Sequence, residues 1–355
     1  MRKQLSLVIK YLSSAILLTT VAFTSYAKSQ AVILQYHHVS NDMPPSTSVT
    51  PEVFSEHLQY IAENYTVLPL QKVIEALQKD SPLPDNAVAI TFDDGYKNIL
   101  ENAHPQLKYH GFPYTIFVNP ILIGTRKNLL THEELKQMSQ EGVSIANHYL
   151  GHDHMLYQPE NVSRETWLKN HKNNILLAED ILKDYIGSTP GYIAYPYGEY
   201  NQEIQQLVKE LNLVGFGQHS GAVSSQSDFT ALPRYPASGV YGNLKTLKVK
   251  LNSLALPIIK NSVDSPELSA QGKTPDWTLK IELDDIYPSQ VACFYQNQTL
   301  ELTWNENTVN IELPAQFPTG RSRVNCTAPS KANRQRYYWY SQPFFVPTER
   351  GDWLD

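Results

Sequence analysis

The residues of this chain best suited to chemistry are two adjacent carboxylates at the end of an apolar run. Asp93 and Asp94 follow residues 87–92, which are typical of a buried strand, and Gly95 lets the chain turn sharply just beyond them. Two anions at the mouth of a buried strand repel each other and lose hydration, so they need a positive partner. A metal ion would supply that charge. Because Asp-Asp-Gly is also a common turn sequence, a solvated turn is the alternative for this motif alone.

Nitrogen ligands follow a second predicted strand. Residues 144–148 end in His148, His152 follows four positions later, and His154 comes next. Two imidazole nitrogens and one carboxylate oxygen form the ligand set of a catalytic zinc site, with one coordination position left open for water. Such sites also accept cobalt, nickel and other divalent ions. The sequence therefore predicts a divalent metal, with zinc as the first choice.

The elements that must position these residues alternate between strands and helices from residue 31 to about residue 256. Strands are expected at residues 31–36, 66–70, 87–92, 114–118, 144–148, 192–195 and 214–217. Alternation of this kind predicts an α/β fold with a parallel sheet or barrel.

Helix starts can be read from capping signals. One helix is expected after Thr50, with proline at its first position, and another after Thr131, where Glu134 completes a capping box. The longest is expected at residues 163–185. Its core-facing positions are predicted to be Trp167, Ile175, Ala178 and Ile181.

A third motif, residues 194–199 (Ala-Tyr-Pro-Tyr-Gly-Glu), stands at the end of the strand expected at 192–195. Together with Asp93-Asp94 and His148-x-x-x-His152, it resembles the polysaccharide deacetylases (carbohydrate esterase family 4, the NodB homology domain). The order and spacing of the three motifs fit the family domain from about residue 32 to about residue 256. The resemblance implies a distorted, incomplete (β/α) barrel, with chemistry at the carboxyl ends of its strands.

The same resemblance assigns roles to individual residues. It implies that Asp94, His148 and His152 hold the metal, which leaves Asp93 free to act as the base on the attacking water. It also implies that the backbone N–H of Tyr197 stabilises the oxyanion.

The general acid is harder to assign. The family motif usually places a histidine late in the domain, and residues 234–256 contain none. His37, at the end of the first strand, resembles the acid of the circularly permuted members that de-N-acetylate poly-N-acetylglucosamine. By that match His37 is the acid and His38 is not. Two ordinary strand-end histidines are the alternative.

Two positions depart from the family pattern. Tyr149 stands where Ser or Thr usually follows the first metal histidine, and Ala194 lies near the place of a missing arginine that orients the base. Arg234 is expected to substitute as the orienting residue, with an ordinary surface arginine as the alternative.

The N-terminus is typical of a signal peptide. Arg2, Lys3 and Lys10 precede an apolar stretch at about residues 11–23, and small residues at 25–27 fit signal peptidase. The apolar stretch is short for a membrane span, so cleavage is expected over an uncleaved anchor, and the protein is predicted to be periplasmic or secreted with no stable membrane span. The net charge of −6 argues against nucleic acid as a partner.

The composition changes after residue 256. A stretch rich in Ser, Pro and Gly is followed by alternating segments at residues 277–283, 309–313 and 337–345, which predict a small β-sandwich. The expected layout is a signal peptide at 1–27, a deacetylase domain at 28–256, a linker at 257–275 and the β-sandwich at 276–355. Because an exported chain meets oxidising conditions, Cys293 and Cys326 are expected to form a disulfide, with two free thiols as the alternative.

The sequence thus predicts a metal-dependent hydrolase that removes N-acetyl groups from an exported or cell-surface polysaccharide such as poly-N-acetylglucosamine. A carbohydrate-binding or export-assembly protein with a degenerate deacetylase fold is the alternative class. The presence of both acids and both metal histidines favours the enzyme. Chitin, peptidoglycan and acetyl esters stay open as substrates.

Overall fold

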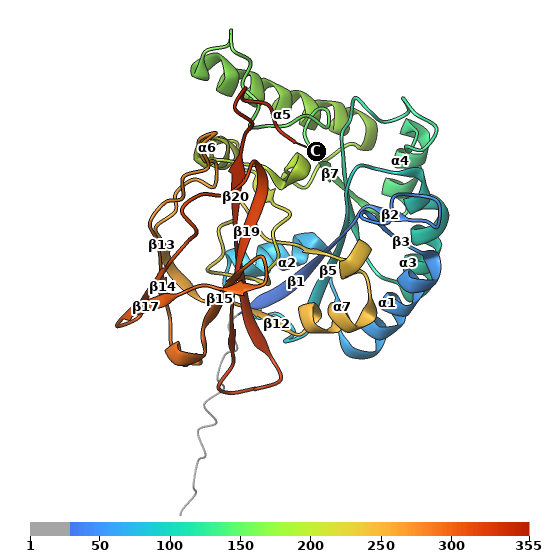
Figure 1. Ribbon diagram of the computed structural model, residues 1–355. Helices are drawn as coiled ribbons and strands as arrows, with labels where there is room; N and C mark the ends of the chain where they lie inside the picture. The colour runs from blue at the N-terminus through green and yellow to red at the C-terminus, as the bar shows by residue number, and fades with distance from the viewer. Residues whose placement is uncertain (1–28, 355) are drawn as a thin grey trace, which may run out of the picture.

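The computed structural model describes residues 29–354, and in it an α/β part is followed along the chain by an all-β part (Figure 1). The predicted signal peptide, residues 1–27, lies outside the described residues. Within residues 29–354, no helix combines the length and the hydropathy that crossing a membrane requires.

The α/β part is built on a nine-stranded sheet with the order β10-β1-β5-β6-β7-β8-β9, in which β11 also pairs with β1 and β4 with β5. All pairs are parallel except β1 with β10. The strands are β1 (Gln30–Tyr36), β4 (Thr66–Val67), β5 (Ala87–Phe92), β6 (Thr115–Val118), β7 (Ser144–Asn147), β8 (Tyr192–Ala194), β9 (Val214–Phe216), β10 (Val223–Ser224) and β11 (Tyr235–Pro236). The sheet curls but its two ends do not pair, so the predicted incomplete barrel is confirmed.

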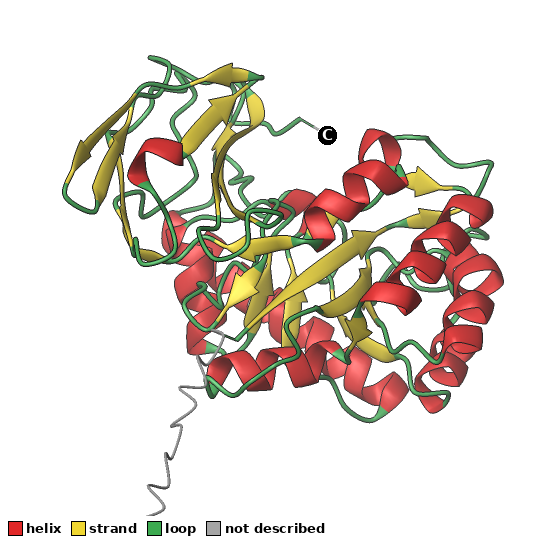
Figure 2. Cartoon of the chain, turned by 90° about the horizontal axis from the view of Figure 1, so that it is seen from below, coloured by secondary structure: helices red, strands yellow, loops and turns green. Residues whose placement is uncertain are grey.

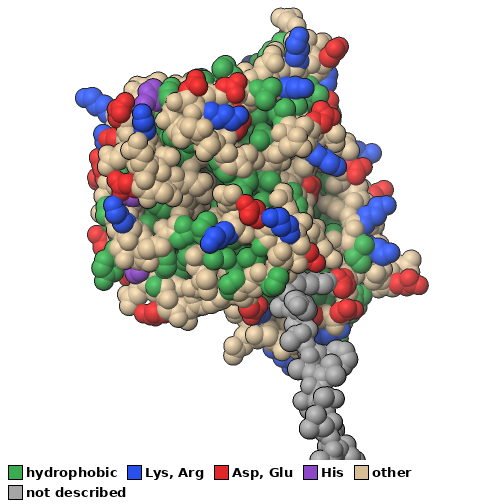
Figure 3. Space-filling model, turned by 180° about the vertical axis from the view of Figure 1, so that it is seen from behind, with side chains coloured by type: hydrophobic (Ala, Val, Ile, Leu, Met, Phe, Trp, Pro, Cys, Tyr) green, Lys and Arg blue, Asp and Glu red, His purple; other side chains and the backbone are tan. Residues whose placement is uncertain are grey.

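Helices cover the outside of this sheet, as Figure 2 shows from below. They are α1 (Pro51–Asn64), α2 (Leu70–Gln78), α3 (His104–His110), α4 (His132–Gln140), α5 (Arg164–Ile186), α6 (Gln202–Glu210) and α7 (Leu244–Leu251). The predicted caps are present: the Thr50 side chain accepts from the backbone N–H of Val53, and Thr131 and Glu134 form a capping box. On the face shown in Figure 3, acidic and basic side chains are interspersed.

The strands β1 and β5 are buried on both faces. Val32 and Leu34 pack into the apolar cluster that contains α1, whereas Ala31 and Ile33 pack into the cluster that contains α2. Successive strand residues point to opposite faces; one face packs against helices such as α1, and the other against α2 and residues of other strands such as Phe117. Both faces are therefore apolar, which is why these strands read as continuous apolar runs.

The buried stripe of α5 differs from the predicted one at one position. Leu182 is completely buried, whereas Ile181 is only partly buried. Because His171, Ile175 and Ala178 define the stripe, helical spacing continues it at residue 182 rather than 181.

The all-β part consists of two sheets packed face to face. One has the order β12-β20-β19-β15-β16 and the other β13-β14-β18-β17. Their strands are β12 (Ser253–Ala255), β13 (Ile258–Asn261), β14 (Trp277–Ile281), β15 (Ala292–Tyr295), β16 (Gln298–Thr299), β17 (Leu302–Asn305), β18 (Thr308–Ile311), β19 (Gly320–Pro329) and β20 (Tyr337–Val346). Residues from both sheets form one apolar core around the fully buried Trp277, as the predicted β-sandwich requires.

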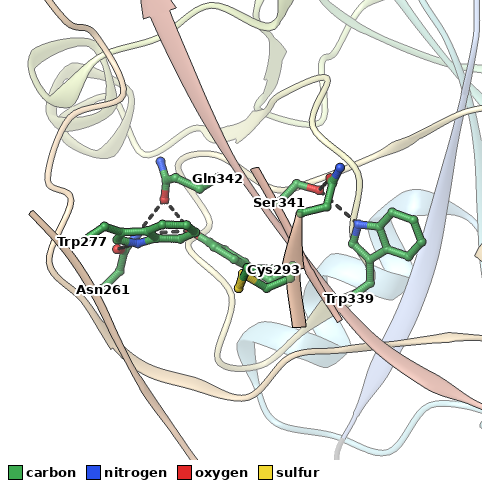
Figure 4. The surroundings of a disulfide bond; sticks show 9 residues. Asn261, Trp277, Cys293, Trp339, Ser341 and Gln342 are labelled. Atoms are coloured by element: carbon green, nitrogen blue, oxygen red, sulfur yellow. Dashed lines mark hydrogen bonds between the residues drawn. A yellow bond between two sulfur atoms is a disulfide. The ribbon is translucent and has the colours of Figure 1, made fainter. Parts of the chain in front are cut away.

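A disulfide joins β15 and β19 inside this core. Cys293 and Cys326 are direct cross-strand partners with an S–S distance of 1.99 Å, so the predicted bridge is confirmed. Figure 4 shows Trp277 beside it, with Asn261 and Gln342 at the indole. The indole N–H of Trp277 donates to the Asn261 side chain at 2.9 Å, which satisfies the buried donor.

The segment expected to be a linker, residues 257–275, is partly structured. It contains β13, which pairs with β14, and Glu267 and Lys273 form isolated bridges with Phe345 and Gln316. A register shift between Ile258 and Lys260 interrupts the alternation along β13, which explains why the sequence pattern missed this strand. In addition, β12 pairs with β20, so the five-stranded sheet begins within residues assigned to the deacetylase domain.

Candidate active site

Most of the predicted site residues, including His152 in the turn after His148, lie beyond the carboxyl ends of strands of the same sheet. His37 follows β1, Asp93 and Asp94 follow β5, His148 follows β7, and Tyr197 lies just beyond β8. Because parallel strands end at the same edge of the sheet, side chains far apart in sequence converge there.

Three of these residues form a compact set of metal-ligating groups. One ligand atom from each of Asp94, His148 and His152 lies within 4.8 Å of the others. The Oδ1 atom of Asp94 is 3.2 Å from Nε2 of His148 and 3.4 Å from Nε2 of His152. This is the set of two nitrogens and one oxygen that the sequence predicts.

Hydrogen bonding supports a cation between these groups. Nδ1 of His148 lies 2.8 Å from the carbonyl oxygen of Ala194, which can only accept, so Nδ1 carries the proton and Nε2 of the neutral ring presents a lone pair. Nε2 and the facing Oδ1 of Asp94 are buried without hydrogen-bond partners. Burial opposes a charge on this ring, yet the Asp94 and Asp93 carboxylates raise the pKa of His148. The two carboxylates thus attract positive charge to Nε2, and a metal cation there would replace a second ring proton. The donor set therefore fits a divalent metal.

The turn that carries His152 is stabilised by a residue that is not one of the three candidate ligands. The side-chain amide of Asn119 donates to the backbone carbonyls of His148 and Gly151. Tyr149, the departure from the family pattern, adopts a left-handed backbone with φ 68° and is buried, and its hydroxyl lies 2.9 Å from Nδ1 of His171. The larger side chain is thus accommodated by pointing into the core under α5.

Asp93 is fixed by an arginine from a distant segment. Arg234 donates from Nη1 to Oδ1 at 2.7 Å and from Nη2 to Oδ2 at 2.8 Å. Burial would raise the pKa of Asp93, but the Arg234 charge outweighs it and keeps the pKa below its usual value. Arg234 is itself fully buried, which excludes the alternative of a surface arginine.

Gln35 is a further contact of Asp93 that the sequence analysis did not identify. Its amide donates to Oδ2 at 2.7 Å. The sequence feature that could have identified it is a glutamine within the otherwise apolar run 31–36. A polar side chain buried in such a strand needs a hydrogen-bond partner.

The two adjacent histidines have different surroundings. Nε2 of His37 lies 4.0 Å from Oδ2 of Asp93, and its Nδ1 has no hydrogen-bond partner. His38 instead stacks on Tyr96 with ring centroids 3.6 Å apart and contacts the Asn98 amide at 2.9 Å. Burial lowers the pKa of His38 to about 4, so this ring is neutral at neutral pH.

The third motif connects the site to the β-sandwich. Tyr197 has φ 57°, a left-handed conformation, and its ring stacks on His154 at 4.0 Å and lies 4.4 Å from the His152 ring. Glu199, completely buried, accepts from His154 at 2.8 Å and from Arg321 of β19 at 3.1 Å. The sequence analysis assigned no role to His154, Glu199 or Arg321, because no local pattern links them.

Comparison with known proteins identifies a family profile, related sequences and a related structure. The polysaccharide deacetylase family profile matches residues 80–216. YxkH of Bacillus subtilis (strain 168), assigned by name to the polysaccharide deacetylases, is 30% identical over 208 residues, covering 58% of this chain and 71% of YxkH. The poly-β-1,6-N-acetyl-D-glucosamine N-deacetylase of Staphylococcus epidermidis (strain RP62A) is 27% identical over 233 residues, covering 59% of this chain and 79% of that protein.

A solved structure has the same fold. The deacetylase PplD of Streptococcus pyogenes, in complex with acetate, superposes with a TM-score of 0.56 at 25% sequence identity, over 63% of this chain and 99% of PplD. The fold and the site define a carbohydrate-active hydrolase. The chain belongs to the polysaccharide deacetylase family.

Proposed function

We propose that this protein removes N-acetyl groups from an exported or cell-surface polysaccharide, with poly-N-acetylglucosamine as the substrate class. The observation that carries the proposal is the placement of Asp93, ionised and held by Arg234, beside the Asp94, His148 and His152 set. The name of the S. epidermidis relative supports the choice of glycan.

The proposed metal is a divalent ion, with zinc as the first choice, held by Asp94, His148 and His152. A bound ion of this kind lowers the pKa of a water molecule and polarises the acetyl carbonyl. The orphaned ligand atoms Oδ1 of Asp94 and Nε2 of His148 support this assignment.

The protein's own side chains would manage the protons. Asp93 would accept the proton of the attacking water, and Arg234 and Gln35 would hold its carboxylate in one orientation while lone pairs remain available. His37 would donate a proton to the departing sugar amine as the C–N bond breaks, which gives acetate and a free amine. The backbone N–H of Tyr197 would donate to the developing oxyanion.

We further propose that residues 1–27 direct export to the periplasm or beyond and that residues 276–355 form an accessory domain. The Cys293–Cys326 bridge supports an oxidising compartment, because disulfides of this kind persist outside the cytosol.

The test is acetate release by the metal-replete protein from β-1,6-linked N-acetylglucosamine pentamer, chitin pentamer, peptidoglycan and an activated acetyl ester. We expect release from the β-1,6 pentamer, its loss with a chelator, and its return on adding zinc, cobalt or nickel. Asp93→Asn serves as the inactive control. Binding of the pentamer without acetate release by the metal-replete protein would instead support the carbohydrate-binding alternative.

A further inference from the structure

A pocket of about 480 Å³ lies between the third-motif loop and the β-sandwich. Tyr197 and Gln218 of the α/β part line it from one side, and Tyr295 and Arg323 of the sandwich line it from the other. The ring of Tyr197 also contacts that of His152, with centroids 4.4 Å apart. The pocket therefore shares a wall with the candidate metal site.

The charged side chains that line this pocket are all positive. Among the described residues, no aspartate or glutamate lines it, whereas two arginines, Arg321 and Arg323, do. Elsewhere both signs are interspersed, as on the face in Figure 3. Arg321 is paired with the buried Glu199, so its charge is largely compensated.

Arg323 has no such compensation. Within residues 29–354, its side chain forms none of the hydrogen bonds or ion pairs that the structure contains, and its Nε is buried without a partner. The Arg323 charge also affects its neighbour His219. Burial is the main cause that lowers the pKa of His219 to about 3, and the positive charges of Arg323 and Arg234 lower it further. A half-buried guanidinium left without an acceptor marks a place where a ligand oxygen would be favoured.

The rest of the lining suits a sugar ring. Tyr241 and Tyr295 offer aromatic surface, and the side-chain amides of Gln218, Gln296 and Asn325 offer donors and acceptors. The lining is largely polar, which suits the hydroxyl and acetamide groups of a sugar. An acetamide carbonyl could accept from the guanidinium, whereas a protonated glucosamine amine would meet like charge with no carboxylate to balance it.

We propose that this pocket is a sugar-binding subsite of the deacetylase, which accepts an N-acetylated unit of the polymer and rejects a de-N-acetylated, cationic unit through Arg323. The inference rests on the proposed function. Its consequence is that removal of one acetyl group disfavours reaction at a nearby unit, so the product carries spaced free amines.

The experiment compares two probes: β-1,6-linked N-acetylglucosamine pentamer and the same pentamer with one unit already de-N-acetylated. For the unaltered protein, we expect kcat/KM to be about tenfold higher for the fully acetylated probe than for the probe with one free amine. A factor of this size corresponds to one modest charge repulsion. Sequencing of the products by mass spectrometry should show spaced amines.

Three variants at one position test the cause. Arg323→Gln should reduce the discrimination to about twofold or less, Arg323→Glu should reverse it, and Arg323→Lys should preserve it, because only the charge is required. Arg334→Gln, at an exposed arginine of the same sandwich, is the matched control and should leave the ratio unchanged. Metal content and melting temperature establish that each variant is folded.

Failure of the subsite and failure of the function give different results. If the unaltered protein releases acetate from neither probe, the proposed function is wrong. If it releases acetate from both with equal efficiency, or if Arg323→Gln keeps the preference, the subsite is wrong. A binding measurement with Asp93→Asn tests for an acidic sugar instead. If this variant bound an oligoglucuronate more tightly than the pentamer, and if adding Arg323→Gln abolished that preference, the N-acetyl assignment would be overturned in favour of an acidic sugar.

Discussion

At the scale of single residues, Asp93 and Asp94 are neighbours in sequence with opposite surroundings. Asp93 is fully buried and its oxygens accept from Arg234 and Gln35, whereas Oδ1 of Asp94 faces two histidine nitrogens and accepts no hydrogen bond. β5 ends at Phe92, and Asp94 lies in a turn with a left-handed backbone (φ 72°), so the two carboxylates point in different directions. One is therefore suited to accept a proton and the other to bind a cation.

Asp93→Asn tests this division. We expect the variant to retain its metal and to lose activity by about 10²-fold or more, because it removes a positioned base and no ligand. Metal content by mass spectrometry and kcat/KM on the β-1,6 pentamer give the two readings. If Asp93→Asn emptied the metal site, the roles of Asp93 and Asp94 would have to be exchanged.

His148→Ala and His152→Ala should each remove metal and activity together. Each substitution takes away one of only three ligands, and a two-ligand site holds a divalent ion far more weakly. The exposed His132 provides a histidine control, since His132→Ala should keep both properties. Full metal occupancy in His148→Ala would disprove the ligand assignment.

His37→Ala should depress acetate release from an N-acetyl substrate much more than from an activated acetyl ester. An amine is a poor leaving group that needs a proton, whereas an activated alcohol leaves with little help. His38→Ala, which removes a ring packed on Tyr96, should leave the amide-to-ester ratio unchanged. Equal losses on both substrates in His37→Ala would indicate a structural role for His37.

At the scale of elements, the strands of the α/β sheet position the candidate site residues, and a strand of the sandwich contacts the loop beside them. β19 carries Arg321, which bonds to Glu199, and Glu199 in turn holds His154 against Tyr197. The five-stranded sheet is thus connected to the loop of Tyr197, whose backbone N–H is proposed to stabilise the oxyanion. The position of β19 relative to β15 depends in part on the disulfide that joins them.

Replacing both Cys293 and Cys326 with serine should lower the free energy of unfolding of the sandwich by roughly 3–4 kcal/mol in the chain-entropy model, since the bridge closes a loop with a sequence separation of 33. Urea unfolding followed by tryptophan fluorescence measures the loss. Under strong reduction the parent should approach the stability of the double variant. Two free thiols in exported protein, found by mass spectrometry, would contradict the bridge.

At the scale of the whole molecule, buried histidines link folding to pH. His57, His171 and His219 are buried, and burial lowers the pKa of the first two to about 4 and of the third to about 3. In the unfolded chain each would titrate near pH 6.5. Below that pH the unfolded state binds protons that the folded state does not, so stability must fall as the pH falls.

We therefore expect the contribution of these three histidines to the free energy of unfolding to be complete above about pH 7 and to decrease from about pH 6.5 towards pH 4. His57→Gln should be less stable at pH 7.5, because His57 lies between the Tyr36 hydroxyl and the Gly242 carbonyl, but its stability should decline less steeply with acid. Urea unfolding at several pH values measures both effects, with the exposed His132→Gln as control. Parallel curves for His57→Gln and the parent would refute the assignment.

The sequence by itself determined the periodic elements and the motifs at their ends. Continuous apolar runs predict strands covered on both faces, capping residues predict where α1 and α4 begin, and the predicted export of the chain led to the expected disulfide. These signals are local: each depends on residues within one or two turns or on composition. They also provided the family resemblance and the candidate metal ligands, because strand ends in a parallel sheet share one edge.

Only the tertiary structure decided the contacts between distant segments. Arg234 meets Asp93 across 141 residues and Arg321 meets Glu199 across 122, and no periodicity relates either pair. The β13 strand was hidden by its register shift, and the pocket beside Tyr197 exists only because the sandwich packs against the third-motif loop. Such features depend on strand order and on how the sheets pack, which local patterns do not encode.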